Sequence, residues 1–256
     1  ERVQSPTEEE PMNDSGIRAC CFDLGNSFLD DTTLTERSVE RMGLRLEEEG
    51  HVDDAGRFTE LYHEINASYE VPFVSHTYGE LGVFETVFRR LGVTGIDAGR
   101  ALAIYRSIVR EETAPADELR EALEHLSSLG IRRAILSNER SERVEAYLET
   151  TGLGPLFDTV VVSERVGIEK PDPRIFREIL RRLDIPPEEA QSAALFGDNS
   201  IADGACRVEG MRFVLVTGYL NRKWYYEKGE EHPADFEIEK VTKESVQRVI
   251  DAFSRG

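Results

Sequence analysis

Several apolar runs in this sequence end on polar side chains, and one further polar residue precedes a stretch of helical spacing. These residues are Asp23, Ser137 with Asn138, Asp198 and Lys170. An aspartate carboxylate can attack phosphorus and form an aspartyl-phosphate, provided that the charge of the two anions is neutralised. Mg²⁺ bound by one or two carboxylates supplies that charge, while hydroxyl and ammonium groups hold the remaining phosphate oxygens. The set therefore indicates metal-assisted phosphoryl transfer.

These side chains can act together only if the fold brings them to one edge of a sheet. After Pro115, short apolar runs alternate with helical stretches, which predicts a parallel sheet covered by helices on both faces. The predicted strands are residues 17–22, 131–136, 159–162, 193–196, 213–216 and 235–238. The predicted helices between and after them are residues 117–129, 142–151, 173–183, 203–209 and 243–253. Ligands of such α/β sheets bind outside the carboxyl ends of the strands, where the polar residues would meet.

The segment between the first strand and Pro115 has a different character. Apolar residues recur there at helical spacing over residues 36–49, 55–70, 78–91 and 97–111. We therefore predict an α/β protein with a Rossmann-like core at residues 17–31 and 114–256 and an all-helical cap inserted at 32–113. Residues 1–16 are polar and acidic without periodicity, so we expect a disordered tail.

The composition narrows the classes of partner. The net charge of −19 repels nucleic acid and anionic membranes at long range. We find no apolar run of the roughly 20 residues that span a bilayer and no positively charged apolar leader. The three cysteines include no CxxC pattern and are expected to be reduced core residues. We expect a cytoplasmic monomer or homodimer that acts on a small molecule.

Four motifs together resemble those of the haloacid dehalogenase (HAD) superfamily. They are Phe-Asp-Leu-Gly-Asn-Ser at 22–27, Ile-Leu-Ser-Asn at 135–138, Glu-Lys-Pro-Asp-Pro-Arg-Ile-Phe at 169–176 and Phe-Gly-Asp-Asn-Ser-Ile-Ala-Asp at 196–203. They occur in the family's order, and their intervals suit the subclass with a helical cap after the first motif. The resemblance covers residue 17 to the C-terminus and implies a Mg²⁺-dependent phosphatase that hydrolyses a small phosphomonoester, such as a sugar phosphate, through an aspartyl-phosphate.

The resemblance also implies a role for each matched position. Asp23 would be the nucleophile and would bind Mg²⁺ together with the backbone carbonyl of Gly25 and the carboxylate of Asp198. Ser137 and Lys170 would bind the transferring phosphoryl group.

The neighbours of these residues would support them. Asn138 is expected at the substrate beside Ser137. Asp203 would act from behind the metal ligands and orient a water molecule or Lys170. Asn199 lies next to the metal carboxylate without an assigned role.

One position departs from the family's pattern. Phosphatases of this family usually carry an aspartate two residues after the nucleophile, which protonates the leaving group and later activates water, but this sequence has Gly25. Loss of a general acid or base slows catalysis by about 10²–10⁴-fold, or roughly 3–5 kcal/mol of barrier. A good leaving group would need less of this help. Asp30 and Asp31 follow in the next segment and could reach inward.

Two other functions stay open at this point. Because Gly25 removes the usual acid, the chain could be a catalytically impaired HAD protein that binds a phosphoryl group or a partner. The string Lys-Pro-Asp-Pro-Arg-Ile at 170–175 is similar to 2-haloacid dehalogenases as well. That chemistry uses no metal, usually shows Tyr where Gly25 stands, and lacks the Gly-Asp pair found at 197–198.

Overall fold

A computed structural model describes residues 16–69, 80–219 and 230–254 of the chain. Its six strands are β1 (Ala19–Phe22), β2 (Arg132–Ser137), β3 (Thr159–Val162), β4 (Ala193–Gly197), β5 (Arg212–Val216) and β6 (Phe236–Ile238). All pairs are parallel, in the order β3-β2-β1-β4-β5-β6. The order reverses between β1 and β4, as in Rossmann-type sheets. The predicted Rossmann-like sheet is confirmed; the predicted disordered tail lies, apart from Gly16, outside the described residues.

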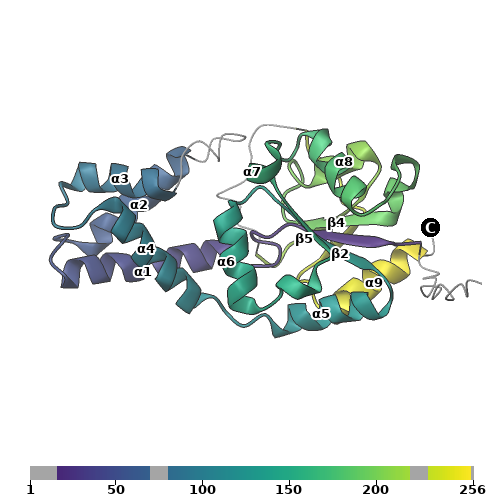
Figure 1. Cartoon of the computed structure of the whole chain (residues 1–256), viewed down its shortest axis with the longest axis horizontal. Helices are drawn as coiled ribbons and strands as arrows, with labels where there is room; N and C mark the ends of the chain where they lie inside the picture. Colours follow the sequence, from purple (N-terminus) through teal and green to yellow (C-terminus); the bar gives the residue numbers. More distant parts are fainter. Residues whose placement is uncertain (1–15, 70–79, 220–229, 255–256) are drawn as a thin grey trace, which may run out of the picture.

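Helices cover both faces of the sheet (Figure 1). On one face, Cys20 and Phe22 share an apolar cluster with α5 (Asp117–Ser128), α6 (Ser141–Thr151) and α9 (Lys243–Ser254). On the other face, Ala19 and Cys21 pack with α8 (Pro173–Arg182). Because both faces are buried, β1 is apolar at every position instead of alternating. A continuous apolar run is therefore what the central strand of this sheet requires.

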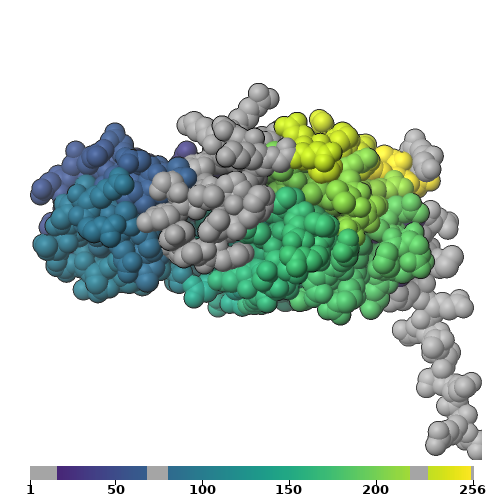
Figure 2. Space-filling view, turned by 90° about the horizontal axis from the view of Figure 1, so that it is seen from above, coloured from purple at the N-terminus to yellow at the C-terminus, as the bar shows by residue number. Residues whose placement is uncertain are grey.

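In the described part of the insertion between β1 and α5, four helices form a cap. They are α1 (Asp31–Glu48), α2 (Ala55–Tyr69), α3 (Glu80–Leu91) and α4 (Ala98–Glu112). The cap has an apolar core of its own, in which the rings of Phe58, Phe84 and Tyr105 are buried. Figure 2 shows it as a blue and teal lobe at one end of the molecule. The predicted helical cap is confirmed, while its limits at residues 32 and 113 stay a prediction.

Several details differ from the predicted elements. Helix α1 begins at Asp31 instead of residue 36, because the Asp30 side chain accepts a hydrogen bond from the Thr33 N–H at 3.1 Å and caps it. Residues 203–209 do not form an α-helix: Gly204–Glu209 is a 3-10 helix, which ends at Gly210 with φ +83°. A short helix, α7 (Ser163–Val166), follows β3 where none was predicted.

None of the helices in the described residues is both long enough and apolar enough to cross a membrane.

Candidate active site

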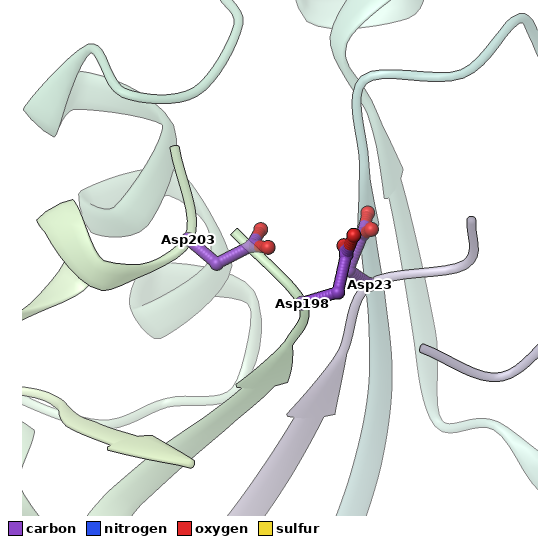
Figure 3. A group of neighbouring side chains, drawn as sticks. All are labelled: Asp23, Asp198 and Asp203. Atoms are coloured by element: carbon purple, nitrogen blue, oxygen red, sulfur yellow. The ribbon is translucent and has the colours of Figure 1, made fainter. Parts of the chain in front are cut away.

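The carboxyl ends of β1 and β4 bring together two carboxylates that are far apart in the sequence. Asp23 follows β1, and its backbone N–H donates to the Phe196 carbonyl of β4 at 2.8 Å. Asp198 follows β4 directly, and Figure 3 shows its carboxylate beside that of Asp23, with Asp203 facing both. One ligand oxygen from each of the three lies within 4.8 Å of the others. The cluster therefore occupies the point where the strand order reverses, the usual ligand position of such sheets.

Lys170 links two of these carboxylates. Its Nζ donates to Oδ1 of Asp23 at 2.7 Å and to Oδ1 of Asp203 at 2.5 Å. The residue is only 2% exposed, so these charge-assisted hydrogen bonds are shielded from water. Lys170 is thus fixed beside Asp23. Its predicted role, binding the transferring phosphoryl group, requires this neighbourhood.

Asn138 holds the backbone of Lys170 in place. Its side-chain Nδ2 donates to the Lys170 carbonyl at 2.9 Å, and its Oδ1 accepts from the Lys170 N–H at 2.8 Å. These bonds position the lysine, and the predicted substrate contact of Asn138 stays a prediction. The sequence signal was an amide next to Ser137, which does not reveal whether the amide meets substrate or backbone.

Asp203 binds two parts of the site and holds them in place. Its Oδ1 accepts from Lys170, and its Oδ2 accepts from the Asn199 N–H at 3.1 Å. The Asn199 side chain in turn accepts from the N–H groups of Ile201 and Ala202, both at 2.9 Å, which fixes the turn after β4. Both oxygens of Asp203 therefore serve internal contacts, and this supports a positioning role over direct metal ligation.

Ser137 lies at the end of the strand next to the one that Asp23 follows. β1 and β2 pair with Phe22 opposite Ile135, so Ser137 and Asp23 end neighbouring strands. Ser137 is 1% exposed, and its hydroxyl oxygen accepts from the Glu139 N–H at 3.1 Å. That bond leaves the hydroxyl proton to donate. The phosphoryl contact of Ser137 and the metal contact of the Gly25 carbonyl stay predictions.

The charges of the cluster are unbalanced. Burial raises the pKa of Asp23 to about 7, since the opposing field of Lys170 is partly offset by Asp203. Burial, followed by Asp203 and Asp23, raises the pKa of Asp198 well above its usual range. Burial alone would lower the pKa of Lys170, but Asp203 and Asp23 raise it, so it stays protonated. Three carboxylates face one ammonium, and a divalent cation between Asp23 and Asp198 fits the remaining negative charge.

Gly197 lets Asp203 approach the end of β4. A Cβ atom at position 197 would overlap Cγ and Oδ2 of Asp203. We expect Gly197→Ala to displace this carboxylate and, with it, Lys170. A misplacement of about 1 Å can cost roughly 10²-fold in rate, so steady-state kcat should fall by about that factor. Gly82→Ala on α3 is the matched control, because a Cβ there meets nothing within 4 Å. Equal kcat for the two variants would contradict the expectation.

Comparison with known proteins places the chain in a family. The family model for haloacid dehalogenase-like hydrolases matches residues 17–203, which include Asp23, Lys170 and Asp198. The chain belongs to this hydrolase family. The match confirms the resemblance drawn from the four motifs and identifies the chain as a HAD hydrolase.

Two relatives of this HAD hydrolase carry phosphatase names. Glyceraldehyde 3-phosphate phosphatase of Methanopyrus kandleri is 27% identical over 231 residues, which cover 88% of this chain and 94% of the relative. Phosphoserine phosphatase of Thermus thermophilus is 26% identical over 228 residues, covering 78% and 88%.

Solved structures of the family share the fold of this HAD hydrolase. YfnB of Bacillus subtilis, solved bound to magnesium, is 22% identical with a TM-score of 0.66, covering 92% of this chain and 99% of that one. L-2-haloacid dehalogenase of Xanthobacter autotrophicus is 17% identical with a TM-score of 0.62, covering 91% and 98%. At these identities the likeness concerns the fold, which phosphatases and dehalogenases have in common.

Proposed function

We propose that this HAD hydrolase is a Mg²⁺-dependent phosphatase that cleaves a small phosphomonoester through an aspartyl-phosphate. The observation that carries the proposal is the convergence of Asp23 and Asp198 at the ends of β1 and β4, with Lys170 bonded to Asp23. A carboxylate oxygen of Asp23 would attack phosphorus as the ester bond breaks. Water would then attack the aspartyl-phosphate, release phosphate and restore the carboxylate.

The groups around Asp23 would each neutralise part of the negative charge of the phosphoryl group. Asp23, Asp198 and the carbonyl of Gly25 would hold Mg²⁺, which when bound supplies the positive charge that a carboxylate needs to meet a phosphate dianion. Lys170 would donate to a phosphoryl oxygen, since its ammonium is already fixed beside Asp23. Ser137 would donate its hydroxyl proton to another oxygen.

The substrate would be a small dissolved metabolite. The printed names of two relatives, glyceraldehyde 3-phosphate phosphatase and phosphoserine phosphatase, support this class. The net charge of −19 disfavours nucleic acid and anionic membranes as partners. We also propose that the enzyme is cytoplasmic and is a monomer or homodimer. The cap, which is inserted directly after β1, would supply the contacts that determine substrate specificity.

A phosphatase screen with and without metal tests the proposal. With Mg²⁺ we expect turnover within a panel of sugar phosphates, glyceraldehyde 3-phosphate, phosphoserine and acetyl phosphate. Metal removal by chelator should lower kcat/KM by about 10²–10³-fold, because metal ions contribute several kcal/mol to such reactions. Asp198→Asn should reproduce the loss in the presence of Mg²⁺. Asp184→Asn is the matched control, since its side chain is 84% exposed on the surface.

The same screen separates the alternatives. Metal-independent release of chloride from 2-chloropropionate would favour a dehalogenase. Binding of phosphate without turnover of any ester would favour an impaired phosphoryl-binding protein. Either result would refute the phosphatase proposal.

A further inference from the structure

A carboxyl group lies beside Gly25, where the family's second aspartate is missing. A Cβ atom built on Gly25 would be 4.0 Å from both Cβ and Oδ2 of Asp31. The chain folds back between these residues, and the Asp31 N–H donates to the Leu29 carbonyl at 2.7 Å. The first residue of α1 thus presents its carboxyl group next to the place where a side chain at position 25 would begin.

We propose that Asp31 is the general acid and base of the reaction, in place of the carboxyl group that position 25 lacks. This inference rests on the proposed phosphatase function. In the first step, an oxygen of Asp23 bonds to phosphorus, the ester P–O bond breaks with its electron pair on the alcohol oxygen, and Asp31 gives that oxygen its proton.

The second step restores the starting state. The Asp31 carboxylate takes a proton from water, the water oxygen bonds to phosphorus, and the bond between phosphorus and Asp23 breaks. Phosphate leaves, Asp23 is again a carboxylate, and Asp31 again carries its proton. Over both steps one ester and one water become one alcohol and one phosphate.

Arg143 of α6 keeps Asp31 in this position. The guanidinium forms an ion pair with Asp31 and donates to Oγ1 of Thr35 at 3.3 Å. The side chains of Asp31 and Arg143 are 20% and 22% exposed, so the pair is only partly screened by water. It joins a helix of the core to the first helix of the cap. Arg143 would also stabilise the carboxylate that forms when Asp31 gives up its proton.

The surroundings of Asp31 suit proton transfer near neutral pH. Burial raises its pKa to about 6 against the opposing effect of Arg143, and Glu139 and Glu80 raise it further. Arg143 faces it from α6, Glu139 from the turn between β2 and α6, Glu80 from α3 and Tyr105 from α4. General acids work best with a pKa near the operating pH.

Leaving-group dependence tests this role. We would measure kcat/KM with Mg²⁺ for p-nitrophenyl phosphate, a good leaving group, and phenyl phosphate, a poor one. Asp31→Asn should lose about 10²–10⁴-fold on phenyl phosphate and much less on p-nitrophenyl phosphate. Asp30→Asn removes the neighbouring charge but keeps a side chain that caps α1, so it should behave as wild type.

A rescue variant makes the test specific to the place of the carboxyl group. Gly25→Asp in the Asp31→Asn background should recover turnover of phenyl phosphate, since the nearest atoms to a Cβ there are at ordinary contact distance. Should Asp31→Asn fold poorly because Arg143 loses its partner, Asp31→Asn with Arg143→Gln removes both charges of the pair, and the ratio between the two substrates is read there.

The possible results distinguish failure of the Asp31 role from failure of the phosphatase proposal. Equal losses on the two substrates in Asp31→Asn would overturn the role of Asp31, while turnover by the wild type would uphold the phosphatase proposal. No wild-type turnover of either ester or of the metabolite panel would overturn the phosphatase proposal and this inference with it.

Discussion

Asp23→Asn is expected to abolish turnover of every phosphate ester. The amide has no charge with which to attack phosphorus, and it is a weak ligand for a divalent cation, so nucleophile and metal ligand are lost together. Removal of a catalytic nucleophile elsewhere costs about 10⁴–10⁶-fold in kcat, and a loss of this order should appear in single-turnover and steady-state assays with Mg²⁺.

The same substitution should leave the fold intact. Asp23 lies at the rim of the sheet with its side chain 13% exposed. Its pKa is raised because burial disfavours the ionised form. Replacing it with a neutral amide relieves repulsion with Asp203, while Lys170 keeps its bond to Asp203. Thermal unfolding should therefore show a Tm equal to or above that of wild type. An inactive variant with a much lower Tm would show that Asp23 mainly stabilises the structure.

Lys170→Met is expected to destabilise the protein more than any other single change at the site. It leaves the carboxylates of Asp23 and Asp203 buried without their cation, and breaking a buried pair in this way costs about 3–5 kcal/mol. Urea unfolding at pH 8 would measure the loss. Lys243→Met at the exposed start of α9 is the matched control, and it should change the free energy of unfolding by less than about 0.5 kcal/mol.

The loss should depend on pH in a defined direction. The folded pKa of Asp23 is about 7, above its ordinary value of 3.8, so ionisation of this group lowers stability as the pH rises from about 4 to about 7. Without Lys170 the pKa moves higher still, because the group that opposes the shift is gone. The gap between Lys170→Met and wild type should therefore be smaller at pH 5 than at pH 8. A gap that grows on acidification would contradict this account.

The strand ends could be predicted because each combines two independent signals. Asp23 and Asp198 each follow a fully apolar run, and a parallel sheet brings such positions to one edge whatever the chain does between them. The motif order then indicated which ends meet. The cap followed from apolar residues at helical spacing, although the polar first turn of α1 carried no such spacing and was missed.

The contacts between motifs could not be predicted in the same way. The amide of Asn138 bonds to a backbone 32 residues later, and its residue type fits a substrate contact equally well. Asp30 and Asp31 are adjacent and chemically identical, yet one caps α1 and the other lies beside Gly25. Only the backbone conformation of this turn separates them, and single-sequence patterns do not determine side-chain direction within a turn.

The insertion of the cap directly after β1 governs the order in which the protein can assemble. β1 is the central strand, but its neighbours β2 and β4 begin only at Arg132 and Ala193. Ribosomes add about 5–20 residues per second, so roughly 110 residues of synthesis separate β1 from its first partner. During those seconds both hydrogen-bonding edges of an apolar strand stay open to other chains. The cap, with its own apolar core, can fold in that interval, and the strand that bears the nucleophile is secured only afterwards.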